Sequence, residues 1–303
     1  MSTEGGTRAV VAALLANTGI AVSKFVAFAF TGSTSMLSEA IHSVADSLNQ
    51  VLLLIGGRRS QRDADDTYQF GYGRLRYVYG FIVAIVLFIV GGVYSVYEGW
   101  HKVRDPHEVH DVGIALGVLI VAVMLETLSF RTAITEANKA RGSRTFPQFI
   151  KDARQPELPV ILLEDFGALV GLLFAIFGVS MAAITHDGRW DGLGAIAIGL
   201  LLIAMAVILV REMASMLVGE SALPEEVEAV RAALLAAPLV DRLIHLRTLH
   251  VGPDALLVAA KIGVTADKSA QQIATGIDEA EAILRAAVPA AEYVFLEPDI
   301  YRA

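Results

Sequence analysis

The chain contains no cysteine among its 303 residues. A disulfide framework, an iron–sulfur cluster and a zinc–thiolate site are therefore excluded. Any bound metal ion must be held by histidine, by aspartate or glutamate, or by backbone oxygen. Charge is also scarce: 18% of the residues are charged, against roughly 25% in an ordinary soluble domain.

Apolar residues replace the missing charge and make up 55% of the chain. A helix needs about 20 consecutive apolar residues to span a bilayer. The first such run lacks a cleavage-site signature and is interrupted by Asn17 and Lys24, so we expect a retained helix rather than a signal peptide. The sequence predicts a polytopic α-helical membrane protein with six transmembrane helices, at residues 9–31, 34–57, 75–100, 112–134, 159–184 and 191–216.

Basic residues predict the orientation of these spans. Thirteen flank one side, namely Arg8, Arg58, Arg59, Arg62, Arg74, Arg76, Arg131, Lys139, Arg141, Arg144, Lys151, Arg154 and Arg211. Only Lys102, Arg104 and Arg189 flank the other side. By the positive-inside rule, both termini are expected in the cytoplasm. We expect an integral protein of a bacterial inner or plasma membrane.

Beyond about residue 220 the pattern becomes that of a small cytoplasmic domain. Helical periodicity covers 225–236 and 269–287, and strand-like alternation covers 243–250, 256–264 and 293–296. This α-β-β-α-β order predicts a two-layer α+β domain. We therefore divide the chain into a transmembrane domain, 1–219, and a cytoplasmic domain, 220–303. From Glu220 onward thirteen acidic residues stand against seven basic ones, which argues against a nucleic-acid partner.

The second predicted span carries a polar stripe. Glu39, His42, Asp46 and Asn49 follow a spacing of i, i+3, i+7 and i+10, so they share one face of a helix. Ionisable groups at membrane depth are costly and mark ion pathways by default. An imidazole and a carboxylate four residues apart suit a divalent cation such as zinc, although a buried His–Asp pair can also join helices. Glu39 is the weakest candidate ligand and fits an exit path or the water boundary equally.

The fifth predicted span carries two adjacent carboxylates, Glu164 and Asp165. They are about 100° apart around the helix, so they cannot both point at one spot. We predict that Asp165 is a metal ligand. For Glu164 three roles stay open: ligand, support of a ligand, or proton carrier. Gly167-x-x-x-Gly171 permits close approach of the second span.

Other intramembrane polar residues are interpreted as structural first: Asn17, Lys24 and Glu126. In the C-terminal domain, surface placement is expected for the possible ligands His245, His250, Asp254, Glu297 and Asp299.

With these residues assembled, the chain resembles the cation diffusion facilitator family of divalent-metal/proton antiporters. The motifs that carry the resemblance are His42-x-x-x-Asp46, Asp165, Phe70-Gly71-Tyr72-Gly73-Arg74, Trp190-Asp191-Gly192 and Leu217-Val218-Gly219-Glu220. The resemblance extends from end to end of the chain.

The resemblance implies a homodimer with a ferredoxin-like cytoplasmic domain. It also implies export of Zn²⁺, or of Mn²⁺, Fe²⁺, Co²⁺ or Cd²⁺, as a transported substrate, with no bound cofactor. The transport site would be tetrahedral, with two ligands from each of the second and fifth spans.

The chain departs from the family in several positions. Ile161 stands where a histidine is common, and Leu163-Glu164-Asp165 is similar to a branch that includes a mitochondrial zinc transporter. Glu164 would then supply the fourth ligand. Accessory metal sites of some relatives are expected to be absent, because the corresponding positions are Tyr68, Tyr72, Ile244 and Leu296.

We therefore predict proton-coupled efflux of a divalent cation by alternating access, through His42, Asp46, Asp165 and Glu164. One alternative is a membrane-embedded metallohydrolase that uses Glu164 beside Asp165, although no H-E-x-x-H or Gly-x-Ser-x-Gly motif is present. A second alternative is a non-transporting metal sensor or scaffold with the same fold.

Overall fold

The computed structural model describes residues 3–300, with side chains described from residue 17 onward. The chain divides into two compact units. Unit 1 comprises residues 1–56 and 78–213, and unit 2 comprises residues 57–77 and 214–303. Each unit is described by itself below.

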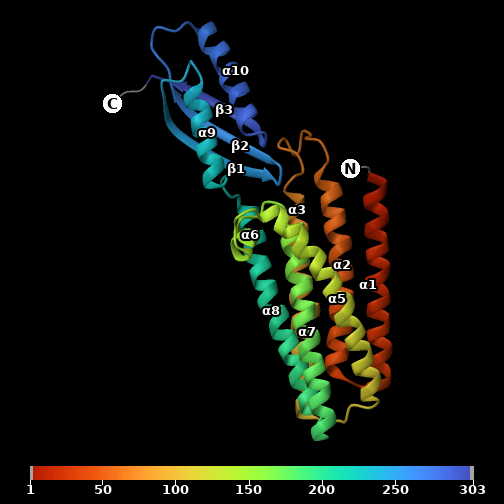
Figure 1. Cartoon of the computed structure of the whole chain (residues 1–303). Coiled ribbons are helices and arrows are strands. Elements are labelled where there is room, and N and C mark those ends of the chain that lie inside the picture. The colour runs from red at the N-terminus through yellow and green to blue at the C-terminus, as the bar shows by residue number, and fades with distance from the viewer. Residues whose placement is uncertain (1–2, 301–303) are drawn as a thin grey trace. The chain divides into compact units, whose positions relative to one another are not determined.

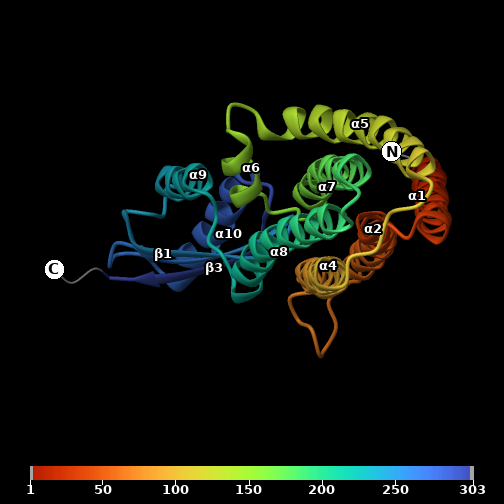
Figure 2. The ribbon, with the colours of Figure 1, turned by 90° about the horizontal axis from the view of Figure 1, so that it is seen from below.

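Unit 1 consists mainly of long helices that run alongside one another (Figures 1 and 2). Their bounds are α1 Thr3–Thr31, α2 Thr34–Ser60, α5 Val112–Arg141, α7 Glu157–Thr185 and α8 Arg189–Val218, together with a composite helix of α3 Leu75–Val86, η1 Leu87–Val93 and α4 Tyr94–Arg104. At about 1.5 Å per residue, helices of 27 to 30 residues are longer than the ~30 Å hydrocarbon core of a bilayer.

Within the described residues, four helices are long and apolar enough to cross a membrane: Leu75–Arg104, Val112–Arg141, Glu157–Thr185 and Arg189–Val218. These correspond to the third to sixth predicted spans. The first two predicted spans also form single helices, α1 and α2, but their membrane crossing stays a prediction. In α2 the reason is the polar stripe itself, because Glu39, His42 and Asp46 interrupt its apolar residues.

Small residues let the helices of unit 1 approach closely. A Cβ atom on Gly192 of α8 would lie 2.7 Å from the carbonyl oxygen of Gly99 in α4, and one on Gly99 would lie 2.6 Å from the carbonyl oxygen of Gly192. The predicted approach of α2 to α7 at Gly171 is confirmed, since a Cβ there would lie 2.6 Å from Oε1 of Glu39. Gly167 instead faces Met205 of α8. Such contacts replace hydrophobic burial as the source of helix association in lipid.

Two local features of unit 1 were missed by the sequence reading. A seven-residue helix, α6 Phe146–Asp152, interrupts what we read as a polar connection. The capping box of Thr145 and Gln148 at its start is a signal that could have revealed it. The seven residues of η1 form a π-helix, which apolar periodicity cannot distinguish from an α-helix.

Unit 2 contains the small α+β fold that the C-terminal sequence predicts. Its elements are α9 Pro224–Ala236, β1 Arg242–Gly252, β2 Ala255–Gly263, α10 Ala270–Ala287 and β3 Ala291–Asp299. The sheet order is β1-β2-β3, with β1 and β2 antiparallel and β2 and β3 parallel. Alternate residues of β2, including Leu256, Val258 and Ile262, are buried in a core that Leu234 of α9 and Leu284 of α10 complete. The predicted α-β-β-α-β order is confirmed.

Residues 57–77 belong to the same compact unit as the C-terminal sheet. The ring of Phe70 meets the ring of Tyr293 in β3 edge-on, with centroids 5.2 Å apart. A Cβ on Gly73 would lie 2.8 Å from the Cα of Gly252, at the β1–β2 turn. The Phe70-Gly71-Tyr72-Gly73-Arg74 motif therefore contributes packing contacts within unit 2.

Candidate metal transport site

The five predicted site residues lie on two helices of unit 1. Glu39, His42 and Asp46 are on α2, and Glu164 and Asp165 are on α7. Glu39, His42 and Glu164 are buried, and the Asp46 side chain is 15% exposed. Asp165 is partly exposed, so the other four are the ionisable groups that lie inside a helical unit where unpaired charge is costly.

His42 and Asp46 form a loosely coupled pair on successive turns of α2. The distance from Nδ1 of His42 to Oδ1 of Asp46 is 3.5 Å. Neither ring nitrogen of His42, nor Oδ1 of Asp46, has a hydrogen-bond partner among the described residues. Buried polar atoms are seldom left in this state, and each one calls for an explanation. Neutral imidazole nitrogen and carboxylate oxygen are both metal donors.

The two carboxylates of α7 make contacts with different helices. Oε1 of Glu164 accepts a hydrogen bond of 2.6 Å from Nδ2 of Asn49 in α2. Oδ2 of Asp165 accepts a hydrogen bond of 2.8 Å from the Ser129 hydroxyl of α5. The two neighbours diverge in their hydrogen bonds, as predicted, although both line the same cavity described below. Glu164 is linked to α2, the helix that carries His42 and Asp46.

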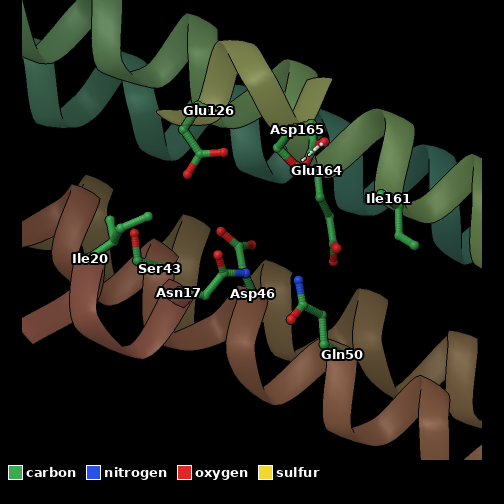
Figure 3. Close-up of a pocket in the computed structure, with 10 residues that line it drawn as sticks. Asn17, Ile20, Ser43, Asp46, Gln50, Glu126, Ile161, Glu164 and Asp165 are labelled. Carbon is green, nitrogen blue, oxygen red and sulfur yellow. Dashed lines mark hydrogen bonds between the residues drawn. The ribbon is translucent and has the colours of Figure 1, made fainter. Parts of the chain in front are cut away.

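A polar cavity of about 30 Å³ lies where helices α1, α2, α5 and α7 meet. A water molecule needs roughly 10–15 Å³ on this measure, so the cavity has room for about two waters or one partly hydrated ion. Figure 3 shows Asp46, Glu126 and Glu164 directed into the space between the helices. The cavity is lined by Asn17, Ile20, Ser43, Asp46, Gln50, Glu126, Ser129, Ile161, Glu164 and Asp165.

The cavity contains residues that the sequence reading did not assign to the site. The sequence predicts a structural role first for Glu126, yet Glu126 contributes a fourth carboxylate to the cavity, from α5. Gln50 and Ser129 were missed altogether. The available signal for Gln50 is its position four residues after Asp46, which places both side chains on the same face of α2. No such spacing relates Ser129 to the polar residues of α2 or α7, because it lies on another helix.

The predicted ligands do not all converge in this conformation. Among the described residues, no group of three His, Asp or Glu side chains is disposed to hold a metal ion. Asp46, Glu164 and Asp165 share the cavity, whereas His42 and Glu39 are not among its lining residues. The four-ligand set therefore stays a prediction, and it requires movement of α2 or α7.

Glu39 is engaged by a cation of the protein itself. Nζ of Lys24 in α1 lies 3.1 Å from Oε2 of Glu39 and 2.8 Å from the Ser43 hydroxyl. Lys24 and Glu39 are both fully buried. A buried ion pair of this kind is strongly disrupted when one partner is lost. The sequence analysis does not predict this ion pair.

Asp191, at the start of α8, caps α2. Its Oδ1 accepts hydrogen bonds from the Ser33 hydroxyl at 2.7 Å and from the Ser35 amide at 3.2 Å, and its Oδ2 accepts one from the Thr34 amide at 2.6 Å. These amides are among the donors that a helix start leaves unpaired, and they lie at the positive end of the helix dipole. The Trp190-Asp191-Gly192 motif is thus structural in this chain.

Among the described residues, the possible ligands of the C-terminal domain form no group of three that could hold a metal ion, and Lys261 neutralises two of them. Nζ of Lys261 lies 3.1 Å from Glu297 and 3.0 Å from Asp299. The prediction of surface placement is wrong for His250, whose side chain is 2% exposed and lies 4.0 Å from the Glu226 carboxylate. The predicted strand is present as β1, and contacts between its end and α9 account for the burial of His250.

A helical unit with apolar spans and a carboxylate-lined polar cavity defines a membrane protein of the kind that conducts ions or polar solutes. The family model of the cation efflux transmembrane domain matches residues 10–218. This match covers more than half of the chain, so the chain belongs to the cation efflux family.

Individual relatives agree with this membership. The chain is 31% identical over 247 residues to the mitochondrial proton-coupled zinc antiporter SLC30A9 of Xenopus laevis, covering 81% of this chain and 44% of that protein. It is 27% identical over 257 residues to metal tolerance protein C4 of Arabidopsis thaliana, covering 84% and 56% respectively. It is 26% identical over 191 residues to the magnetosome protein MamB of a Magnetospira strain, covering 62% and 59%. The chain thus spans about half the length of the curated relatives it matches.

Among solved structures, a variant of the MamM C-terminal domain is 22% identical and covers 26% of this chain and 94% of its own. The TM-score of 0.25 is too low for a structural argument.

Proposed function

We propose that this protein exports a divalent transition-metal cation, Zn²⁺ first of all, from the cytoplasm in exchange for protons. The observation that carries the proposal is the cavity between α2, α5 and α7, which four carboxylates line. Carboxylates at membrane depth attract cations and repel anions. Membership of the cation efflux family and the likeness to proton-coupled zinc antiporters support the same conclusion.

In this proposal Asp46 is the central ligand, because it lines the cavity and also lies beside His42. Closure of α7 on α2 would bring Glu164 and Asp165 toward Asp46, and rotation of the His42 ring would add a nitrogen donor. Unpartnered nitrogens on His42 support this, since no hydrogen bond has to be broken to free them. Alternating exposure of one fixed site to the two sides is the usual principle of secondary transport.

Coupling to protons follows from the donor set. A metal ion requires neutral imidazole and ionised carboxylate, so metal ions and protons compete for the same atoms. Protons that enter from the acidic side would release the metal there, and their loss on the cytoplasmic side would prepare the site again. The direction of export then follows the direction of the proton gradient.

The donor set also bears on the choice of metal. An imidazole with carboxylates suits zinc, whereas carboxylates alone admit harder ions such as Mn²⁺. We propose Zn²⁺ as the main substrate because His42 is adjacent to Asp46. Fe²⁺, Co²⁺ and Cd²⁺ are the further candidates, and none of these ions acts as a cofactor.

We further propose six membrane spans, with α1 and α2 as the first two, both termini in the cytoplasm, and a homodimer in the plasma membrane. The positive-inside distribution of Lys and Arg supports the orientation. Apart from the short α6, each described helix of unit 1 is long enough for the core of a bilayer when α3, η1 and α4 are taken as one.

The test is zinc flux into sealed proteoliposomes under an imposed pH gradient, with a zinc-sensitive dye inside. Asp46→Asn should reduce pH-driven flux by roughly 100-fold or more while the protein elutes as the wild type does, because the amide loses the charge that binds the metal. Asp66→Asn, which removes an exposed loop carboxylate, is the matched control and should transport normally.

Undiminished flux through Asp46→Asn would refute the site. No flux through the wild type would refute export itself: hydrolytic activity would then favour the metallohydrolase, and inactivity the sensor or scaffold.

A further inference from the structure

Lys24 is a fully buried cation within the membrane unit. Its ammonium group lies 3.1 Å from Oε2 of Glu39 and donates a 2.8 Å hydrogen bond to the Ser43 hydroxyl. Long lysine side chains in membrane helices ordinarily extend to the interface and keep their charge in water. The Lys24 side chain is instead directed inward, between α1 and α2. Contact of its charge with water therefore does not explain its position.

Only one of the two carboxylate oxygens of Glu39 has a hydrogen-bond partner among the described residues. Oε1 of Glu39 has no hydrogen-bond partner among the described residues, and the side chain is fully buried. Space for this oxygen exists because residue 171 of α7 is glycine: a Cβ there would lie 2.6 Å from it. Glu39 thus presents a free, buried oxygen to the interface between α2 and α7, the two helices that carry the proposed ligands.

The Lys24–Glu39 pair is close to the transport cavity. Glu39 is one turn before His42 and two turns before Asp46 on the same helix. Ser43, which accepts a hydrogen bond from Lys24, is itself a lining residue of the cavity. A cation that leaves Asp46 along α2 toward Thr34 would therefore pass Glu39.

Without a counter-charge, Glu39 would be a trap for that cation. Opposite charges several ångströms apart attract one another strongly at the effective dielectric of a protein, and a divalent ion doubles the attraction. An ion bound between Glu39 and Asp46 would dissociate slowly. A transporter needs binding that is strong enough for loading yet weak enough for release.

We propose that Lys24 is a tethered cation that occupies Glu39, so that this carboxylate does not hold back the transported ion. Lys24 is then a positioning and affinity-setting residue: it does not touch the metal but cancels the charge of a second acidic position on the path. This inference rests on the proposed cation transport and adds a role for residues outside the ligand set.

The experiment measures the zinc dissociation constant by isothermal titration and the maximal flux in proteoliposomes, for the full chain. Lys24→Gln and Glu39→Gln each remove one charge and keep a side chain that can hydrogen-bond to the remaining partner. Lys24→Gln should bind zinc roughly tenfold or more tightly and transport it more slowly, because Glu39 is left uncompensated. Glu39→Gln should bind zinc roughly tenfold or more weakly, because the Lys24 charge is then unopposed.

The double variant Lys24→Gln/Glu39→Gln contains neither buried charge, so it also serves if a single variant does not fold. Its zinc affinity should lie between those of the two single variants. Lys102→Gln is the matched control: Lys102 is another buried lysine of unit 1, and it donates instead to the Gly32 carbonyl at 3.1 Å. Its affinity should equal that of the wild type.

Opposite shifts for the two single variants support the tethered cation. Shifts in the same direction, or shifts no larger than that of Lys102→Gln, overturn it and leave the pair as helix packing. If only the double variant folds, an affinity more than tenfold from wild type in either direction overturns it, because cancelled charges should leave affinity nearly unchanged. Zinc flux by the wild type tests the proposed function separately, so the two failures are distinguishable.

Discussion

The start and the middle of α2 differ in whether their polar groups have hydrogen-bond partners. At its start, the Ser33 hydroxyl and the amides of Thr34 and Ser35 all donate to Asp191. One to four turns further on, Oε1 of Glu39, both ring nitrogens of His42, Oδ1 of Asp46 and Oδ1 of Asn49 have no hydrogen-bond partner among the described residues. The two regions belong to the same helix and share the same membrane unit.

This difference in hydrogen bonding indicates that the start of α2 has a structural role and that its middle has a role in cation binding. A polar network in which each group has a partner fixes one arrangement and stabilises it. Buried donors and acceptors without partners lower the free energy of unfolding. Their presence in a folded protein is explained when a bound ligand supplies the missing partners. The contrast predicts that substitutions at the start of α2 change stability, whereas substitutions in its middle change cation binding.

The largest effect on stability is expected for Asp191→Ala. It leaves the Ser33 hydroxyl and two helix-start amides without their acceptor, which should lower the free energy of unfolding by roughly 3 kcal/mol or more. Thermal unfolding of the purified protein measures this effect. Zinc affinity of the folded fraction should remain that of the wild type.

Asp105→Ala is the control for this prediction, since it removes an exposed carboxylate after α4. If Asp191→Ala unfolds at the wild-type temperature, the hydrogen bonds to Asp191 do not stabilise the protein. The proposed structural role of the start of α2 would then be wrong.

An intermediate effect is expected for Asn49→Ala, which removes the 2.6 Å hydrogen bond to Glu164. Groups that orient a metal ligand typically contribute about 10–100-fold to affinity. The zinc dissociation constant should therefore rise by roughly tenfold. Ser129→Ala, which removes the more exposed bond to Asp165, should raise it less. An Asn49→Ala variant with wild-type affinity would indicate that Glu164 is not part of the binding set.

The smallest effect is expected in unit 2, in the loop before α3. The Tyr72 hydroxyl donates a 2.5 Å hydrogen bond to Asp65, which lowers the pKa of that carboxyl and raises the pKa of Tyr72. For Asp65 the bond's contribution to loop order is present above its unfolded pKa and is lost as pH falls through the lowered folded pKa. For Tyr72 it is present below the unfolded pKa and is lost as pH rises through the raised folded pKa.

Tyr72→Phe should therefore move the pKa of Asp65 up toward its ordinary value. The Thr67 and Tyr68 amides donate to Asp65 at 2.9 and 2.8 Å, so their hydrogen exchange at acid pH should become faster once intrinsic rates are divided out. Tyr68→Phe keeps the Tyr72 bond and is the control. Equal exchange in both variants would show that the Tyr72 hydroxyl does not order the loop.

Much of the fold was predictable because it depends on local patterns. Apolar runs about 20 residues long located six helices of unit 1, and strand alternation located the sheet of unit 2. The short α6 was missed because a seven-residue helix leaves too little periodicity. Its capping box, Thr145 and Gln148, is the only local sequence pattern that marks its start.

For the candidate site, the sequence predicts which residues share a face of one helix but not which residues of different helices are in contact. Spacing placed Glu39, His42 and Asp46 on one face of α2, but it could not show that Lys24 pairs with Glu39 or that Asn49 bonds to Glu164. Those contacts join residues 15 and 115 positions apart. The same holds for Glu126, whose place in the cavity depends on how α5 packs against α7.

The central claim is that the carboxylate-lined cavity between α2, α5 and α7 binds the transported cation. Its most direct test is anomalous scattering at the zinc absorption edge from crystals of the full chain grown with Zn²⁺. A peak about 2.0–2.2 Å from an oxygen of Asp46, with a donor from α7 in the same shell, is the predicted result. Zinc found only in the C-terminal unit, with none within the helices of unit 1, would contradict the claim.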